Sequence, residues 1–238
     1  MHHVTLDTWS RLSSPLHRLD ARAKIVAAAA ILLSLVVTER SYAVLLPAYG
    51  VLITAAALVG RLPPAGLLAR AALVLPFVGS VAALNLWGGD ATRAASVVGK
   101  SFLSASTVLV LLGTTPLHAL LRGLESLGAP RFFLMVAQFL YRYLFVLSEQ
   151  AQHMLQARRC RAPLPHRGSL AGSAAGVVAV LFARSYGRAE RIHQAMLARG
   201  FRGHFVLLAP TALGRRDFVF LAATAAALGS IHLLLWNL

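Results

Sequence analysis

The sequence predicts an all-α, polytopic membrane protein with about five transmembrane helices and a separate region of long amphipathic helices. Two properties of the whole chain support this class: 58% of its 238 residues are hydrophobic, and only 13% are charged. The mean hydropathy of +0.68 is too high for an ordinary soluble domain. In addition, apolar runs suited to crossing a bilayer recur along the chain, and a long basic segment precedes the last of them.

The apolar runs give the expected order of the membrane helices. A first, shorter run is followed by four longer ones, and the five cover residues 25–38, 42–60, 71–87, 101–117 and 218–236. We expect the first two runs to form a hairpin through the polar residues 39–41. The chain is then predicted to divide into N-terminal transmembrane helices over 1–113, a basic middle region over 114–216 and a final transmembrane helix over 217–238.

The formal net charge of +15 is unevenly distributed. More than half of the 23 Lys and Arg residues lie between Thr114 and Arg216, where only Glu125, Glu149 and Glu190 are acidic. Basic residues collect in the cytosolic parts of membrane proteins, and five alternating spans place this region on the same side as the basic N-terminus. We therefore expect a multi-pass membrane protein with a cytoplasmic N-terminus, in contact with the lipid bilayer and with no nucleic acid.

Three helices are predicted in the basic middle region. A short one covers 116–127 and stops at a glycine. A long one over 131–159 is stopped by two following prolines. A second long one over 169–199 ends at Gly200, a residue that readily takes the left-handed conformation of a helix cap.

Polar side chains recur along one face of each long helix. In the first helix they are spaced seven, four, seven, four and three residues apart, at Arg131, Gln138, Arg142, Glu149, His153 and Gln156. In the second helix, one arc of the surface carries Arg184, Arg188, Arg191 and Arg199. We expect both helices to lie at the membrane surface or to tilt through it. A face solvated by water or lipid headgroups explains the pattern as well as a binding surface does.

The two long helices end in similar sequences. Aligned at Ala157 and Ala198, both ends read Ala-Arg-x-x-Arg followed by a small residue. An arginine at a helix C-terminus is favoured by the helix dipole, and its fixed fork of donors can bind a carboxylate or backbone carbonyls of a partner. Helix-end arginine is also common as a simple cap. The repetition makes docking the sharper hypothesis, and its candidate residues are Ala157, Arg158, Arg159, Ala198, Arg199 and Gly200.

These features resemble the transmembrane T component of energy-coupling factor (ECF) transporters, and within that family the cobalt-type, CbiQ-like members. The resemblance spans essentially the whole chain and includes residues 19–24, which read Leu-Asp-Ala-Arg-Ala-Lys. The motif at 198–200 matches the family fully, whereas Arg159 replaces the glycine of the first motif. Ala21 stands where a proline is usual, so residues 19–24 are assigned no role.

The resemblance implies a non-catalytic subunit of an ATP-driven importer in the bacterial inner membrane, for cobalt ions, with nickel or a vitamin as alternative substrates. It implies two kinds of partner. These are two CbiO-like ATP-binding ATPase subunits and a CbiM-like substrate-binding membrane subunit, with or without a small accessory subunit. In that family the two long helices form a cytosolic coupling domain, and each inserts its arginine motif into a groove of one ATPase. Arg158 and Arg199 are the implied docking residues.

A second feature lies at the start of the second long helix. Gly168, Gly172 and Gly176 repeat at every fourth position, with small residues between them. Such a face lets another helix approach closely. Packing of the two long helices on each other and docking of the substrate-binding subunit explain it equally well.

No pattern for catalysis, a cofactor or a metal site is found. No His-Glu-x-x-His occurs, and the single cysteine, Cys160, excludes an intrachain disulfide and a thiolate metal cluster. Residues 99–101 read Gly-Lys-Ser like the end of a phosphate-binding loop, but Ala94 occupies the position of the required first glycine. The alternative function is an integral membrane enzyme acting on lipid substrates. Such an enzyme would need acidic residues or histidines clustered at one membrane depth, and the apolar runs lack them.

Overall fold

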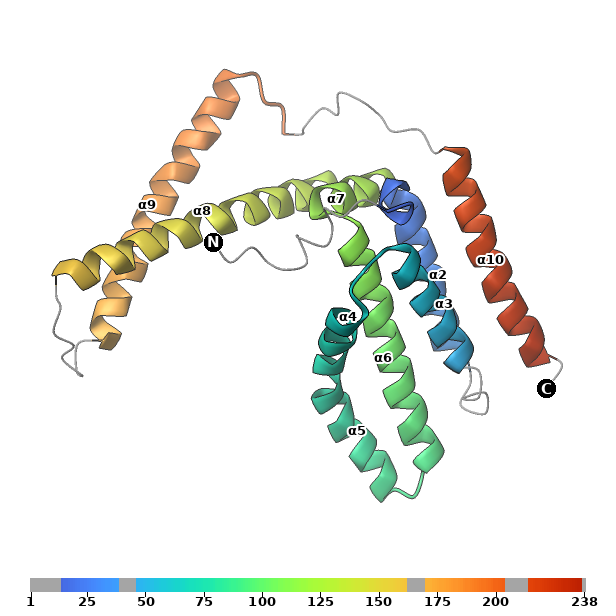
Figure 1. The fold of residues 1–238 in the computed structure, drawn as a ribbon. Helices are drawn as coiled ribbons and strands as arrows, with labels where there is room; N and C mark the ends of the chain where they lie inside the picture. The colour runs from blue at the N-terminus through green and yellow to red at the C-terminus, as the bar shows by residue number, and fades with distance from the viewer. Residues whose placement is uncertain (1–13, 39–45, 162–169, 204–213, 237–238) are drawn as a thin grey trace. The chain divides into compact units, whose positions relative to one another are not determined.

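The computed structural model describes four segments of the chain, residues 14–38, 46–161, 170–203 and 214–236. Throughout these segments the secondary structure is helical and contains no strand, which confirms the predicted all-α class. The chain forms two compact units (Figure 1). Unit 1 combines Met1–Gly128 with Pro210–Leu238, and unit 2 is Ala129–Ala209.

The helices follow the predicted order along the chain. Unit 1 contains the 3₁₀ turn η1 (Leu16–Arg18), α2 (Ala21–Val37), α3 (Leu46–Val59), α4 (Pro64–Ala71), the 3₁₀ turn η3 (Ala72–Val74), α5 (Leu75–Trp87), α6 (Ala91–Thr114), α7 (Leu117–Ser126) and α10 (Arg215–Trp236). Unit 2 contains α8 (Arg131–Arg161) and α9 (Leu170–Ala198).

Four helical stretches of the described chain are long and apolar enough to cross a membrane: Pro64–Trp87, Ala91–Thr114, Arg131–Arg158 and Arg215–Leu233. Three of them overlap predicted spans, those at 71–87, 101–117 and 218–236, and α3 is a shorter apolar helix within the predicted span 42–60. The stretch in α8 was expected to differ from a plain span because of its polar face. By length and composition alone it also qualifies.

The stretch from Pro64 to Trp87 changes its helical geometry near its middle. Three residues of 3₁₀ helix, η3, separate α4 from α5, and Pro76 stands in the first turn of α5. Proline has no backbone N–H and its ring crowds the carbonyl four residues earlier, so a regular α-helical ladder cannot continue through this point. The tighter 3₁₀ turn accommodates the break without ending the span.

Helix α2 is central to unit 1, where it contacts α6, α7 and α10. The short helix α7, which was predicted as part of the basic middle region, therefore packs on α2 within unit 1. Two clusters of buried apolar side chains hold the unit together. One consists of Leu16, Ile53, Ala57, Leu62, Leu67 and Val110. The other consists of Leu35, Tyr49, Leu228 and Ile231.

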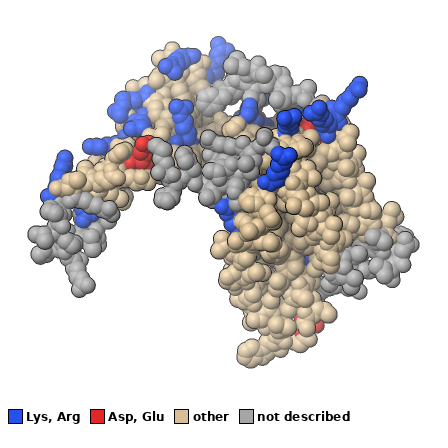
Figure 2. All heavy atoms as spheres, in the orientation of Figure 1, with Lys and Arg blue, Asp and Glu red and all other residues tan. Residues whose placement is uncertain are grey.

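Large apolar side chains cover much of the outer surface of unit 1. Leu73, Phe77 and Trp87 are 76%, 78% and 92% exposed. Such exposure is unfavourable in water and is expected where side chains face lipid. Within unit 1, the Lys and Arg residues visible in Figure 2 gather at the end where α10 begins, and the rest of its visible face is largely uncharged. This distribution is typical of a membrane-embedded unit.

Unit 2 consists of the two long helices packed on each other, with α9 crossing α8 in Figure 1.

In unit 1, the short helix α7 ends before Gly128, whose φ of 99° lies in the left-handed region. This agrees with the predicted stop at that glycine. The hairpin residues 39–41 and the two prolines after α8 lie outside the described residues.

Candidate functional site

The C-terminus of α9 is a complete Schellman cap. Gly200 has a φ of 78°, and its N–H donates to the carbonyl of Leu197 at 2.9 Å. The N–H of Phe201 donates to the carbonyl of Met196 at 3.0 Å. These two bonds satisfy carbonyls that would otherwise lack a partner at the helix end. The prediction that Gly200 caps this helix is therefore confirmed.

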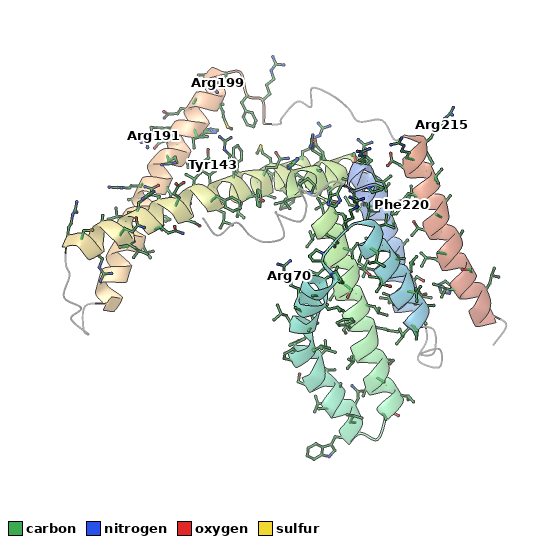
Figure 3. All side chains as sticks on the ribbon, in the orientation of Figure 1. Arg70, Tyr143, Arg191, Arg199, Arg215 and Phe220 are labelled. Carbon is green, nitrogen blue, oxygen red and sulfur yellow. The ribbon has the colours of Figure 1, made fainter. Side chains whose placement is uncertain are left out.

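Arg199 is the last residue before the turn of this cap (Figure 3). Its backbone N–H lies 3.3 Å from the Ala195 carbonyl and 3.1 Å from the Met196 carbonyl, so its backbone position is fixed. Its side chain is exposed, and within the described residues the guanidinium has no hydrogen-bond or ion-pair partner. The arrangement presents a free cation on a rigid base at the end of a 29-residue helix.

The end of α8 is built differently. The helix continues through Ala157 and Arg158 to Arg161, two residues beyond its predicted end. Arg159 replaces the glycine of the second motif, and arginine is a good helix former that does not favour a left-handed cap. The first motif therefore lies within the last turns of a helix, whereas the second lies at a cap. Ala157 is exposed and Arg158 is half-buried.

The contact between α8 and α9 includes one polar pair and a sizeable cavity. Arg188 Nη2 donates to Gln150 Oε1 at 3.4 Å. Arg188 therefore faces α8, whereas Arg184 and Arg191 of the same predicted arc are exposed. The Glu149 and His153 side chains of the α8 stripe are also exposed and approach to 3.9 Å.

The cavity between α8 and α9 has a volume of about 560 Å³. Phe139 and Tyr143 of α8, whose rings stack with centroids 6.3 Å apart, lie on one side (Figure 3). Phe182 and Tyr186 of α9 lie on the other, and both are largely exposed. Phe201, from the α9 cap, also lines this space. Because Phe182 and Tyr186 remain largely exposed, this part of the α8–α9 contact is an open groove and not a close-packed core.

The glycine stripe is partly outside the described chain. Gly168 lies among the residues that the structure does not describe, and Gly172 lies in the first turn of α9. At Gly176, a methyl group in place of the Cα hydrogen would meet no described heavy atom within 4 Å. Close packing of α8 on this face is therefore not seen at Gly176, and the face is open there.

Residues 19–24, which received no role from the sequence, organise the start of α2. Asp20 is the N-cap, because its Oδ1 accepts a hydrogen bond from the Arg22 N–H at 2.9 Å. The N–H of Asp20 donates to Oδ1 of Asp217 at 2.8 Å, which joins the starts of α2 and α10. An aspartate directly before an apolar run is a recognisable capping signal. Nothing local in the sequence points to its partner almost two hundred residues away.

Within the described residues, no group of three or more His, Cys, Asp or Glu side chains could hold a metal ion. Residues 99–101, the chance likeness to a phosphate-binding loop, lie inside α6 and not in a loop. Lys100 Nζ donates to the Thr38 carbonyl, so this lysine links α6 to the end of α2.

Comparison with known proteins finds related transport proteins. Residues 12–207 match the family described as CbiQ, cobalt transport protein. The chain is 30% identical over 145 residues to the cobalt transport protein CbiQ of Rhodobacter capsulatus, which covers 61% of this chain and 59% of that protein. It is 32% identical over 126 residues to the nickel permease LarQ of Lactiplantibacillus plantarum, which covers 52% and 44% of the two chains. The chain thus spans about half the length of the curated relatives it matches.

Proposed function

Because this chain belongs to the CbiQ family of cobalt transport proteins, we propose that it is the energy-coupling transmembrane subunit of an ECF-type, ATP-driven importer. In this role it catalyses no reaction. It transmits movement between two ATP-binding ATPase subunits and a substrate-binding membrane subunit. The proposed location is the inner membrane, with the N-terminus in the cytoplasm.

The observation that carries the proposal is the exposed, partner-free guanidinium of Arg199 on the Schellman cap of α9, within the described part of the chain. A helix is stiff along its axis, and a capped end does not fray, so a load applied at Arg199 is passed along α9. Arg158, in the last turns of α8, is the matching contact for a second ATPase. The guanidinium fork suits binding of a carboxylate or of backbone carbonyls in an acceptor groove.

The loose contact between α8 and α9 supports the coupling role. Their interface borders an open cavity and includes the Arg188–Gln150 bond, whose 3.4 Å length is long for a hydrogen bond. Two ATPases that move relative to each other would shift the two helix ends, and an interface of this kind can adapt without breaking a close-packed core. The open face at Gly176 is the proposed contact for the substrate-binding subunit.

The proposed substrate is a divalent transition-metal ion. One curated relative is named as a cobalt transport protein and another as a nickel permease, so both ions are candidates. The proposal assigns no metal ligand to this chain, and selection of the ion belongs to the substrate-binding partner.

The test is co-purification of the chain with its candidate ATPase pair. The double variant Arg158→Ala and Arg199→Ala should insert in the membrane normally and lose the ATPase. Each arginine is expected to contribute about 1.5 to 3 kcal/mol through hydrogen bonds to a charged group. The matched control replaces Arg184 and Arg191, which are exposed on α9 away from its end. Equal retention of the ATPase by wild type and the double variant would refute docking through these arginines.

A further inference from the structure

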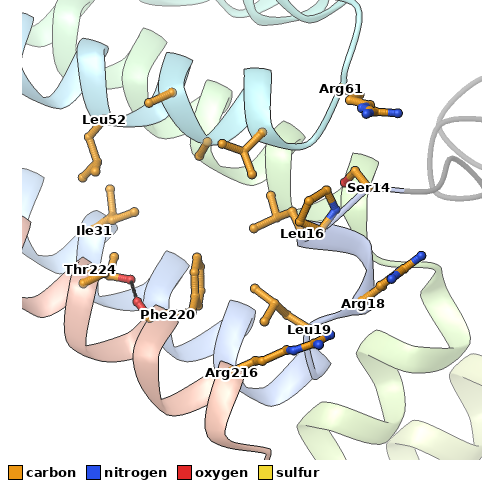
Figure 4. A pocket seen from close by; sticks show the side chains of 15 residues that line it. Ser14, Leu16, Arg18, Leu19, Ile31, Leu52, Arg61, Arg216, Phe220 and Thr224 are labelled. Carbon is orange, nitrogen blue, oxygen red and sulfur yellow. Dashed lines mark hydrogen bonds between the residues drawn. The ribbon is translucent and has the colours of Figure 1, made fainter.

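A second cavity, of about 750 Å³, lies within unit 1 between η1, α2, α3 and α10 (Figure 4). Its walls are mainly apolar and include Ile31 of α2, Leu52 of α3 and Phe220 of α10. Figure 4 shows Arg18, Arg61 and Arg216 at one end of this space and the apolar side chains of Ile31 and Leu52 toward the other. The cavity is therefore amphipathic, with a cationic end and an apolar body.

Among the described residues, the arginines at the cationic end have no direct ion-pair partner. The side chains of Arg18, Arg61 and Arg216 are exposed, and within the described residues none of them forms a hydrogen bond or an ion pair. The nearby carboxylates are already engaged. Asp20 Oδ1 caps α2, and both oxygens of Asp217 accept backbone N–H bonds, at 2.8 Å from Asp20 and 2.8 Å from Gly214. Three like charges at one cavity mouth favour an anionic occupant.

Arg61 occupies a backbone position that normally takes glycine. Its φ is 51°, and among the described non-glycine residues it alone has a positive φ. The Arg61 N–H donates to the Leu58 carbonyl at 2.9 Å and the Leu62 N–H to the Ala57 carbonyl at 3.1 Å, which is the Schellman pattern seen at α9. In α9 the equivalent position is Gly200. A non-glycine L-residue is strained in this conformation, so arginine at position 61 makes the helix cap less stable than glycine would.

The cationic end lies at helix termini, and the apolar body lies along helix sides. Arg61 lies two residues beyond the C-terminus of α3, and Arg216 is in the first turn of α10. Both helices are apolar beyond these arginines. In a membrane this places the guanidinium groups at headgroup depth and the apolar walls at acyl-chain depth. Basic pockets between membrane helices are suited to acidic lipid headgroups.

We propose that this cavity binds an acidic phospholipid, with its phosphate group at Arg18, Arg61 and Arg216 and an acyl chain against Ile31, Leu52 and Phe220. The three arginines favour an anionic group. The apolar walls beyond them suit an acyl chain, which a lipid has and a free phosphate lacks. A lipid in this position contacts η1, α2, α3 and α10 at once and holds their ends together. The residues of this site are distinct from the helix ends of unit 2, so a negative result for lipid binding would leave the proposed docking of the ATPase unaffected.

The test is native mass spectrometry of the full chain released from neutral detergent micelles. Phosphatidylglycerol and phosphatidylcholine with identical acyl chains are added in parallel, and retained lipid is counted. We expect preferential retention of phosphatidylglycerol. The Arg61→Gly variant should bind it about tenfold more weakly, because one charge-assisted contact is lost. Its thermal midpoint without added lipid should be unchanged or higher, because glycine relieves the strain at φ 51°.

Arg216→Gln serves as a second variant, and Arg122→Gln on α7 is the matched control. Arg122 is exposed in the same unit, lies outside the cavity lining and donates to the His118 carbonyl of its own helix. The control should retain phosphatidylglycerol as wild type does. Equal retention of the two lipids, or unchanged retention in both cavity variants, would overturn the proposal. Competition by sn-glycerol 3-phosphate as strong as that by the intact lipid would show an anion site without acyl-chain binding, and would overturn it as well.

Discussion

Lys24 Nζ donates a hydrogen bond to the backbone carbonyl of Thr114 at 3.0 Å, and it lies 3.4 Å from Thr115 Oγ1. The bond joins the first turn of α2 to the last residue of α6. The lysine side chain is only 5% exposed. Carbonyls at a helix C-terminus lack partners within their own helix, and this lysine supplies one. Two helices ninety residues apart in sequence are thereby fixed at the same end of unit 1.

The first prediction concerns this bond. Lys24→Met keeps most of the side-chain volume and removes the donor, so the Thr114 carbonyl loses its charged partner. The free energy of unfolding should fall by about 1.5 to 3 kcal/mol. Thermal unfolding in detergent measures the change. Arg22→Met, two residues earlier on the same helix and only half-buried, should have a smaller effect. An unchanged midpoint for Lys24→Met would mean that the bond does not stabilise unit 1.

The second prediction concerns the link between α10 and α2. Asp217→Ala removes both acceptors and leaves the N–H groups of Asp20 and Gly214 without their carboxylate partner. We expect a loss of about 2 kcal/mol, because Asp217 is buried and the two amides are left incompletely satisfied. Asp90→Ala is the control, since Asp90 also lies at the start of a helix, α6, but is exposed and makes no side-chain cap bond, whereas Asp217 lies in the first turn of α10. Equal unfolding midpoints for the two variants would contradict this role.

The third prediction concerns a polar cluster at the other end of α2. The Tyr49 hydroxyl is fully buried and lies 2.6 Å from Ser34 Oγ and 3.2 Å from Thr38 Oγ1. His232 Nε2 of α10 lies 2.9 Å from the same Ser34 oxygen. Tyr49→Phe should cost about 0.6 to 1 kcal/mol, the range for a hydrogen bond between membrane helices.

Chemical or thermal unfolding in detergent would measure the Tyr49→Phe effect. Tyr186→Phe is the control, because Tyr186 is 69% exposed on α9. A loss no greater than that of the control would show that the cluster is held together by packing alone. A double-mutant cycle with His232→Ala would then separate the hydroxyl contact from the contact between α2 and α10.

The fourth prediction concerns the α9 cap. Gly200→Ala places a Cβ at a φ of 78°, which strains the turn that positions Arg199. Hydrogen exchange of the backbone amides near the cap should become about fivefold faster, which corresponds to about 1 kcal/mol. Gly176→Ala provides the contrast, because it lies within the helix and its new Cβ would meet open space. Exchange as slow as in wild type would mean that the cap does not depend on glycine.

Local sequence features anticipated the helices because they act over a few residues. Apolar runs gave the membrane helices, and Gly128 and Gly200 marked the ends of α7 and α9 because both have the positive φ that glycine tolerates. The end of α8 was placed two residues too early. There the sequence offered only proline stop signals, and the arginines before them extend the helix.

The docking motif could be proposed from sequence because both arginines lie in the same short pattern near predicted helix ends. The different surroundings of the two arginines could not be predicted from sequence. Whether an arginine is exposed at a cap, like Arg199, or half-buried in a last turn, like Arg158, depends on how the helices pack. The repeated motif therefore led to the docking hypothesis for these two arginines, and the three-dimensional arrangement distinguished their environments.

By itself, the sequence determined the all-α membrane class, the order of the helices, the family and the two arginine-bearing helix ends, because periodicity, apolar length and capping are local properties. Only the tertiary structure brought Lys24 to Thr114, Asp217 to Asp20, and the arginines at positions 18, 61 and 216 to one cavity. These contacts join residues far apart in the chain. They form when helix faces pack in one particular arrangement, and hydrophobic spacing does not specify which polar side chains then meet.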